Sequence, residues 1–372
     1  MKRYLEDQVR SDLAKKMVFV GGARQVGKTT LAQSIIEQQS EYLNWDIPDH
    51  RHAILQQKLP DTNLWVFDEI HKYTQWRNFL KGLYDQQKAL RTTRRILVTG
   101  SARLDFYRHG GDSLQGRYHY LRLHPLSVAE LDLKSQPELT DLLRLGGFPE
   151  PYLGGSEDEA RRWSREYRVR LIEEDIRSLE SLKDLGSLEL LTHRLPALVG
   201  SPLSVNGLRE DLQVSHKTLE NWLTVLERFY TIFRLSSFGA PPIRAVKKMR
   251  KHYHADWTLV ADESARLENL VACHMLKWVH FQQDTLGKET ALKYFRDLED
   301  REIDFVITEN GVPTQAIEVK LSQTTLSKPL IYFSKKFPAC QMFQLHLQGD
   351  LDAVGPRGIR IIPVLTYLQT LI

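Results

Sequence analysis

The strongest indication of the fold is the sequence Gly22-Ala23-Arg24-Gln25-Val26-Gly27-Lys28-Thr29. It satisfies GxxxxGK[ST], the pattern of a phosphate-binding loop, at every fixed position. An apolar run, Met17–Gly21, precedes it, and a helical pattern, Thr29–Gln39, follows it. In that position the backbone N–H groups of the loop and the positive end of the helix dipole can surround phosphates. The full motif in this context disfavours the alternative, a glycine-containing strand-to-helix turn without a ligand.

The loop predicts an ATP site with assigned roles. Residues Gly22 to Thr30 are expected to bind the nucleotide. Lys28 is expected to contact its β- and γ-phosphates, and the hydroxyl of Thr29 is expected to ligate Mg²⁺. Lys28 is therefore also a candidate catalytic residue.

A second stretch, Leu64-Trp65-Val66-Phe67-Asp68-Glu69, is an apolar strand that ends in two acids. We expect Asp68 to hold the magnesium ion, directly or through water, and Glu69 to act as general base for the attacking water. The alternative is a solvated strand end. A further apolar run, Ile96–Thr99, is followed by Gly100 and Ser101. Thr99 or Ser101 could sense the γ-phosphate, and a simple loop start is the alternative.

The first third of the chain predicts a doubly wound α/β sheet, because short β-rich apolar runs alternate with amphipathic helical stretches. Ligands should lie at the carboxyl ends of its strands, where the motifs above fall. The expected strands are Met17–Gly21, Glu41–Trp45, Leu64–Phe67, Arg95–Thr99 and Tyr118–Leu123, and the helices between them include Trp76–Leu90.

Length and composition predict an ordinary globular protein of about two to three domains, since the chain has 372 residues, 42% hydrophobic and 26% charged. No stretch is apolar and long enough for a membrane helix, and Met1–Arg10 lacks a secretion signal. We therefore expect a cytoplasmic protein without a membrane partner. Cys273 and Cys340 have no zinc-site or disulfide spacing. The net charge of +4 permits DNA as a partner without demonstrating one.

We expect three domains, with boundaries at 1–135, 136–250 and 251–372. The middle segment has helical patterns, and Ser204–Leu235 predicts a helix-turn-helix in a winged-helix fold. Its second helix mixes acids with basic residues, which disfavours direct reading of DNA. There are two better electropositive candidates, although solvated charge explains both as well. One is the basic group Lys247, Lys248, Arg250 and Lys251, and the other is the face of the helix beginning at Glu157 that bears Arg161, Arg162, Arg165 and Arg168.

The C-terminal third contains two strand patterns that can bring acids and a lysine together. Asp304 lies in Arg301–Ile307, and Glu318 and Lys320 lie in Ala316–Lys320, where spacing by two places both on one face. Two carboxylates and a lysine can hold a divalent metal, activate water and stabilise a scissile phosphate. Glu268, in a preceding helical pattern, could be a further metal ligand.

This arrangement makes Asp304, Glu318 and Lys320 candidate catalytic residues with a second Mg²⁺ or Mn²⁺. Ile303, Phe305 and Ile307 should share the core face of their strand while Asp304 points away. The alternative is an exposed strand with alternating polar residues.

Five stretches together resemble the prokaryotic AAA-type ATPases that carry a C-terminal domain of unknown function: GARQVGKTT, LWVFDE, LVTGSA, GRYHYLRLHPLS and LGGFPE. The resemblance covers nearly the whole chain. It places Arg117 at the position of an arginine finger, which would complete the ATP site of a neighbouring copy in a homo-oligomer. Taken alone, Arg117 is a single surface cation before a strand. The order Glu268, Asp304, Glu318-Val319-Lys320 resembles the PD-(D/E)xK nuclease fold.

The sequence thus favours an ATP-hydrolysing protein whose nucleotide state controls a nuclease-like module acting on DNA. The alternative is a regulatory or scaffold ATPase that binds a partner protein and cuts nothing, since fold does not entail activity. A third hypothesis, phosphotransfer to a small molecule, lacks a recognisable acceptor site.

Overall fold

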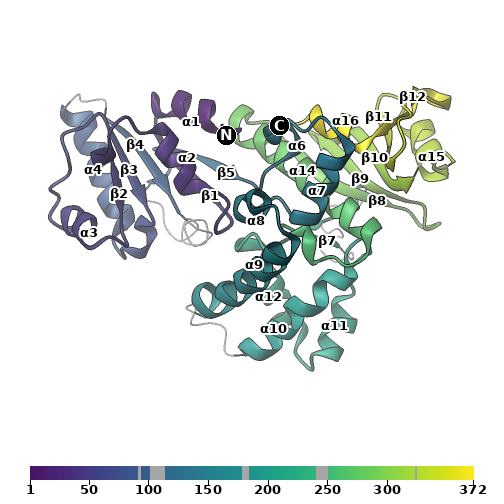
Figure 1. The fold of residues 1–372 in the computed structure, drawn as a ribbon, viewed down its shortest axis with the longest axis horizontal. Coiled ribbons are helices and arrows are strands. Elements are labelled where there is room, and N and C mark those ends of the chain that lie inside the picture. The colour runs from purple at the N-terminus through teal and green to yellow at the C-terminus, as the bar shows by residue number, and fades with distance from the viewer. Residues whose placement is uncertain (91–93, 101–113, 178–183, 240–249, 323–324) are drawn as a thin grey trace. The chain divides into compact units, whose positions relative to one another are not determined.

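The computed structural model describes residues 1–90, 94–100, 114–177, 184–239, 250–322 and 325–372. The chain divides into two compact units (Figure 1). Unit 1 comprises Met1–His124 and Arg228–Tyr230, and unit 2 comprises Pro125–Glu227 and Thr231–Ile372. In the part of the chain that is described, no helix is long and apolar enough to cross a membrane.

Unit 1 is built on a five-stranded parallel sheet with the order β2-β3-β4-β1-β5. Its strands are β1 Met17–Gly22, β2 Tyr42–Asn44, β3 Leu64–Asp68, β4 Arg95–Thr99 and β5 Tyr118–Leu123. Its helices are α1 Glu6–Leu13, α2 Lys28–Ile35, α3 Pro48–Leu55 and α4 Trp76–Leu90. The predicted α/β fold is confirmed, because the five expected strands form one parallel sheet and helices lie between them in the sequence.

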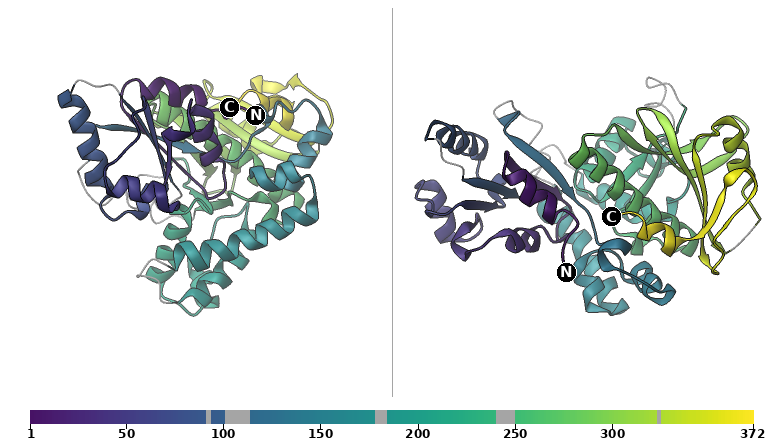
Figure 2. Two further views of the ribbon diagram at one scale, coloured as in Figure 1. Left: turned by 60° about the vertical axis from the view of Figure 1, so that its left-hand side comes forward. Right: turned by 90° about the horizontal axis from the view of Figure 1, so that it is seen from above.

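Helices cover both faces of this sheet (Figures 1 and 2). On one face, α1 and α2 contact β1 and β4. On the other, Ile54 of α3 and Trp76 and Leu80 of α4 pack with Phe19 and Phe67 in one buried cluster. Strands buried on both faces explain the near-continuous apolar runs of the sequence.

The strand order brings together motifs that are far apart in the sequence. β4 lies between β1, which leads into the phosphate-loop motif, and β3, which ends in Asp68. Thr99, the last residue of β4, pairs with Val20 of β1 and with Asp68 of β3. The carboxyl ends of three adjacent strands therefore meet at one edge of the sheet.

The first part of unit 2 is helical. Its helices are α6 Val128–Leu131, α7 Gln136–Leu145, α8 Pro149–Gly154, α9 Glu157–Arg170, α10 Leu185–Arg194, α11 Val205–Asp211 and α12 His216–Arg228, whose last residue belongs to unit 1. A π-helical turn, Leu171–Ile176, follows α9. After α12, β6 Ile232–Leu235 pairs antiparallel with β7 Lys251–His254.

The second part of unit 2 is a six-stranded mixed sheet with the order β12-β13-β11-β10-β9-β8. Its elements are α14 Glu263–Leu286, β8 Thr290–Arg296, β9 Glu302–Glu309, β10 Val312–Ser322, α15 Lys328–Lys336, β11 Gln341–Gln348, β12 Ala353–Val354, β13 Arg360–Pro363 and α16 Val364–Gln369. Residues of α14 pack on one face and residues of α15 on the other (Figure 2).

A bulge interrupts the pairing of β8 with β9. Lys293 pairs with Val306, and the next pair is Phe295 with Ile303. Between these pairs, one residue of β8 lies opposite two residues of β9, Asp304 and Phe305, so β9 contains one extra residue. Bulges of this kind bend a strand and re-aim its side chains.

The bulge makes one prediction wrong. Phe305 and Ile307 pack with Leu270 and other residues of α14, whereas Ile303 packs with Phe333 of α15. The three residues therefore do not share a core face, because the extra residue shifts the alternation between Ile303 and Phe305.

Candidate functional site

The phosphate-loop motif follows β1 directly and ends in the first residues of α2. Gly27 has φ = 97°, in the left-handed region that favours glycine. Gly22 has φ = 150°, and a Cβ atom there would lie 2.3 Å from the carbonyl oxygen of Leu123. Both glycines are therefore required by the local backbone, which turns sharply from the buried strand into the helix.

The ammonium of Lys28 lies inside this turn. Nζ donates to the carbonyl oxygen of Ala23 at 2.5 Å and to that of Gly22 at 3.2 Å, and the residue is 7% exposed. A buried cation is thus held at the centre of the loop, where a bound phosphate would exchange these carbonyl contacts for charge-assisted hydrogen bonds.

Three hydroxyl groups converge on the buried carboxylate of Asp68. Thr29 Oγ1 donates to Oδ2 at 2.9 Å, Tyr42 Oη donates to Oδ2 at 2.5 Å, and Thr99 Oγ1 donates to Oδ1 at 2.6 Å. The Thr29 hydroxyl and the Asp68 carboxylate are oxygen ligands of the kind that Mg²⁺ prefers. Because they already lie in contact, the residues present fit a magnesium site shared by α2 and β3.

Glu69 follows β3 with a left-handed backbone, φ = 56°. Its Oε2 atom lies 3.5 Å from Nε2 of His71 and 3.8 Å from Nζ of Lys72. Burial raises the pKa of Glu69 above its usual range, against the opposing charges of Lys28 and Lys72. A carboxylate with a raised pKa is the better proton acceptor, as a general base requires.

The other predicted residues of the loop have different environments. Ala23 and Val26 are buried, Arg24 and Gln25 are half-buried, and Thr30 is exposed in the first turn of α2. Ser101, one of the two predicted sensors, lies outside the described residues. The hydroxyl of Thr99, the other one, is in direct contact with Asp68.

Arg117 directly precedes β5, at the amino end of a parallel strand. It is thus at the edge of the sheet opposite to the phosphate loop of the same chain. Its guanidinium pairs with Asp85 of α4, with Nε 3.0 Å from Oδ1. An arginine finger at this location would have to act in the site of another copy.

Arg3 is a residue that the sequence analysis missed. It is 4% exposed, and its guanidinium donates to the carbonyl oxygen of Val26, in the phosphate loop, and to that of His124, each at 2.6 Å. Tyr4 donates to the carbonyl oxygen of Arg122. The segment before α1 therefore fixes the phosphate loop to the end of β5. No local pattern identifies such a contact, because its partners are 23 and 121 residues away.

We expect Arg3→Ala to raise the KM for ATP about tenfold with a smaller change in kcat, because two charge-assisted hydrogen bonds that position the loop are lost. Arg3→Lys should recover part of the loss, since an ammonium can still reach one carbonyl. Steady-state ATP hydrolysis measures both values. Arg10→Ala, at an exposed arginine of α1, is the control. An unchanged KM in a folded Arg3→Ala protein would exclude this positioning role.

A second group of acids lies in unit 2, where the C-terminal site is predicted. Asp304 Oδ2 accepts a hydrogen bond from the backbone N–H of Val319 at 2.9 Å. The backbone pairing of β9 with β10 ends at Phe305 and Ile317. Beyond that pair, the side chain of Asp304 accepts a hydrogen bond from β10 in place of a backbone carbonyl. Asp304 thus lies beside the strand that carries Glu318.

Glu318 and Lys320 lie on the same side of β10, as predicted. Nζ of Lys320 is 2.7 Å from Oε1 of Glu318. In the described part of the chain, Oε2 of Glu318 is buried without a hydrogen-bond partner. Burial, and after it the charge of Asp304, raises the pKa of Glu318 and that of Glu268.

Glu268 contacts two residues that the sequence analysis did not assign to this site. Its Oε1 atom accepts from Tyr253 Oη at 2.7 Å and lies 3.4 Å from Nζ of Lys251. The same ammonium lies 3.7 Å from Oδ1 of Asp304 and 2.6 Å from Oε1 of Glu302. Burial, which by itself lowers the pKa of an ammonium, is outweighed by these carboxylates, and the pKa of Lys251 is raised.

Within the described ranges, no three His, Cys, Asp or Glu side chains are grouped so that they could hold a metal ion. Asp304 interacts with two sets of side chains. One set contains Lys251 and Glu268, and the other contains Glu318. The ligand set of Glu268, Asp304 and Glu318 stays a prediction.

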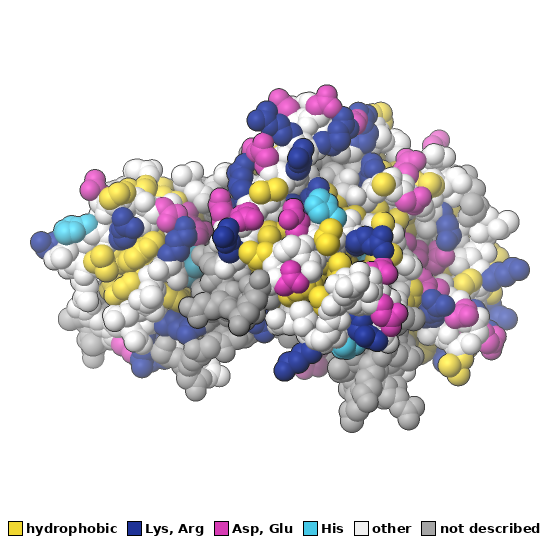
Figure 3. Space-filling model, turned by 90° about the horizontal axis from the view of Figure 1, so that it is seen from below, with side chains coloured by type: hydrophobic (Ala, Val, Ile, Leu, Met, Phe, Trp, Pro, Cys, Tyr) yellow, Lys and Arg dark blue, Asp and Glu magenta, His cyan; other side chains and the backbone are white. Residues whose placement is uncertain are grey.

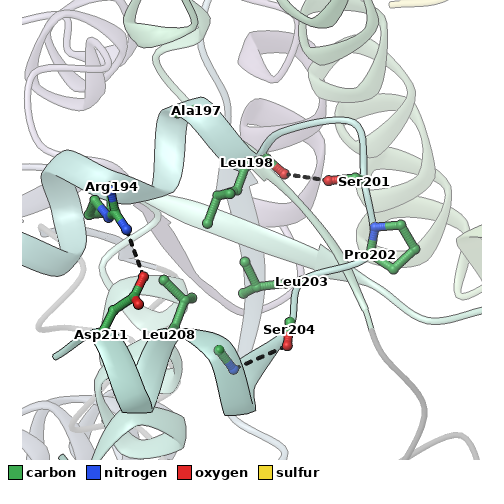
Figure 4. Close-up of a pocket in the computed structure, with 10 residues that line it drawn as sticks. Arg194, Ala197, Leu198, Ser201, Pro202, Leu203, Ser204, Leu208 and Asp211 are labelled. Atoms are coloured by element: carbon green, nitrogen blue, oxygen red, sulfur yellow. Dashed lines mark hydrogen bonds and ion pairs between the residues drawn. The ribbon is translucent and has the colours of Figure 1, made fainter. Parts of the chain in front are cut away.

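A pocket of about 300 Å³ lies between α10 and α11 (Figure 4). Its lining is mostly apolar, with Leu198, Leu203 and Leu208 pointing inward, and the ion pair of Arg194 with Asp211 lies at one side. Among the described residues, no acid cluster or phosphate-loop residue lines it.

Three family models match successive parts of the chain. Residues 14–132 match a model described as an AAA domain. Residues 136–267 and 264–367 match two models described as domains of unknown function, DUF8612 and DUF4143.

Curated relatives are distant. An uncharacterized protein of Methanocaldococcus jannaschii is 23% identical over 261 residues, which cover 61% of this chain and 58% of that protein. An uncharacterized protein of Mycobacterium tuberculosis is 24% identical over 324 residues, which cover 83% of this chain and 71% of that protein. The match thus spans little more than half the length of the archaeal relative.

The matches to solved structures are distant. The Walker-type ATPase of Pyrococcus abyssi has a TM-score of 0.43 at 15% identity and covers 71% of this chain and 95% of its own. The RuvB Holliday junction branch migration motor of Thermotoga maritima has a TM-score of 0.32 at 20% identity and covers 62% and 88%. At these TM-scores neither structure bears on function.

Proposed function

We propose that this chain is an ATP-hydrolysing switch whose nucleotide state controls unit 2, since residues 14–132 match a model described as an AAA domain. The observation that carries the proposal is the contact of Thr29 with Asp68, beside the buried ammonium of Lys28. Lys28 binds the β- and γ-phosphates. Thr29 and Asp68 hold Mg²⁺, which neutralises charge that the same phosphates share.

Glu69 acts as the general base in this proposal. It accepts the proton of the attacking water, and its raised pKa supports that transfer. Thr99 supports the geometry of Asp68 from the neighbouring strand. The test is release of phosphate from ATP by the purified protein with Mg²⁺. An inactive wild-type protein that also fails to bind ATP would refute the assignment.

We further propose that Arg117 completes the site of a neighbouring copy. Arg117→Ala should bind ATP normally and hydrolyse it about tenfold or more slowly, because charge on the transferred phosphoryl group is no longer stabilised. Arg95→Ala is the control, since Arg95 is an arginine of similar exposure, paired with Glu37 at 3.9 Å.

Mixing decides whether Arg117 acts between copies. The Arg117→Ala and Glu69→Gln variants each lack a different residue of a site shared by two copies. In a mixed oligomer, some interfaces combine the intact Glu69 of one variant with the intact Arg117 of the other. Recovery of ATP hydrolysis supports the proposal. An ATPase that stays monomeric and equally active at every dilution would exclude it.

Unit 2 in this proposal binds a partner without cutting it. A second candidate function is metal-dependent cleavage of DNA, favoured by the closeness of Asp304, Glu318 and Lys320 and by the order of α14, β8, β9, β10, α15 and β11, which is that of the nuclease-like resemblance. Under this candidate, labelled duplex, single-stranded or branched DNA is cut with Mg²⁺ or Mn²⁺, and Glu318→Ala abolishes the cut while ATP hydrolysis survives.

Charge on the helical part of unit 2 gives little support to DNA binding. On α9, Arg161 pairs with Glu157, and Arg162 and Arg170 both pair with Glu166. Figure 3 shows Lys and Arg side chains interspersed with Asp and Glu on the face drawn. Because acids of the same helix accompany these arginines, α9 presents little net positive charge to a phosphate backbone.

A further inference from the structure

The acids around Lys251 come from two separate elements of unit 2. Glu268 lies on α14, Glu302 and Asp304 lie on β9, and Lys251 itself opens a third element, β7. The side chain of Lys251 is fully buried. Its ammonium lies between the three carboxylates, at 2.6 Å from Glu302 Oε1, 3.4 Å from Glu268 Oε1 and 3.7 Å from Asp304 Oδ1.

We propose that Lys251 is the resident cation of this acid cluster and excludes a divalent metal from it. The ammonium occupies the position between Glu268 and Asp304 that the predicted metal would need. The inference does not depend on ATP hydrolysis, because every residue in it belongs to unit 2.

The spacing of the acids fits an ammonium better than a metal. Mg²⁺ requires oxygen ligands at about 2.0–2.1 Å in near-octahedral geometry. In this cluster the carboxylate oxygens of Glu268, Glu302 and Asp304 instead lie around Nζ of Lys251 at hydrogen-bond and ion-pair distances. To bring these oxygens within bonding distance of a metal ion, the ammonium of the buried Lys251 would have to leave the cluster. Its charge would then lose its carboxylate partners. Such a loss is strongly unfavourable for a buried ammonium.

Each carboxylate also has a second partner besides Lys251. Glu268 accepts from Tyr253, and Glu302 Oε2 lies 3.4 Å from Nη1 of Arg296. Asp304 accepts from the backbone N–H of Val319. A divalent ion would therefore have to break several interactions at once rather than fill open coordination positions.

The chain also closes over this cluster. Gly200 has φ = 84°, and a Cβ atom there would lie 3.3 Å from Oε2 of Glu268. The next residues lead into the pocket wall, where Ser201, Pro202 and Leu203 are seen in Figure 4. Pro202 forms a β-bridge with Lys251 itself. This segment therefore packs against both the acid and the lysine.

The test is Mn²⁺ binding to the full chain without nucleotide, measured by electron paramagnetic resonance titration and by the shift in unfolding temperature. Lys251→Met should bind Mn²⁺ about tenfold or more tightly than wild type, because a positive charge between three carboxylates is removed. The double variant that combines Lys251→Met with Asp304→Asn should lose that gain, although the amide oxygen that replaces the carboxylate can still accept from Val319.

The matched control is Lys277→Met. Lys277 is also a buried lysine of unit 2, and it forms an ion pair with Glu130. Its removal should create no Mn²⁺ site. A folded Lys251→Met protein that gains no Mn²⁺ affinity, or a Lys277→Met protein that gains as much, would overturn the proposal.

The wild-type protein decides the matter if Lys251→Met does not fold. Wild type and Asp304→Asn should then show the same Mn²⁺ titration, because no metal binds at the cluster in either. Mn²⁺ bound by wild type and lost in Asp304→Asn would overturn the inference and favour a metal site.

Discussion

Lys28→Ala is expected to lower kcat/KM for ATP by about 10²–10³-fold. The variant removes the buried ammonium while leaving Gly22 and Gly27 to shape the loop. Without it, no lysine cation neutralises the β- and γ-phosphates at the centre of the turn. Phosphate release and equilibrium binding of ATP measure the two parts of the loss.

The control for Lys28→Ala is Lys15→Ala, an exposed lysine of the same unit. It should behave as wild type. ATP turnover at the wild-type rate in folded Lys28→Ala protein would show that hydrolysis takes place elsewhere or that the loop does not bind phosphates.

Glu69→Gln is expected to keep ATP affinity and to slow hydrolysis by about 10²–10⁴-fold, because an amide cannot accept the proton of water. The pH dependence gives a second signature. The base must be ionised, so activity falls as pH falls through its pKa, and burial raises that pKa. The acid limb of the rate profile should thus lie at higher pH than for an ordinary glutamate, and the residual activity of Glu69→Gln should lack it.

Glu37→Gln, at an exposed glutamate of unit 1, is the control for this change. It should leave both the rate and its acid limb unchanged. If Glu69→Gln protein is folded but no longer binds ATP, then Glu69 holds the metal or the loop rather than the water.

The candidate ATP site could be predicted because its signals are local. Eight consecutive residues define the loop, and an apolar strand points to Asp68. What the sequence could not give is the order of the strands, which places Thr99 and Tyr42 around that carboxylate. Residues that act through long-range contacts, such as Arg3, leave no periodic or spacing signal.

The C-terminal site shows the opposite case. Asp304, Glu318 and Lys320 were found from alternation, and Glu318 and Lys320 do lie together. Alternation failed at the β-bulge, which moves Ile303 to the other face. The sequence predicts Lys251 only as one of a basic group with Lys247, Lys248 and Arg250, because its burial depends on acids that lie 17 to 53 residues further along the chain. Lys247 and Lys248 lie outside the described residues. The three-domain division stays a prediction.

The two hydrogen bonds of Arg3 have a practical consequence for anyone who wishes to express the ATPase part alone. A fragment cut at residue 14, where the AAA-domain match begins, discards Arg3, Tyr4 and all of α1. Such a fragment keeps every residue of the nucleotide motif but lacks the anchor of the Val26 carbonyl. A fragment of residues 1–124 retains it, and we expect only that fragment to reproduce the ATP affinity of the full chain.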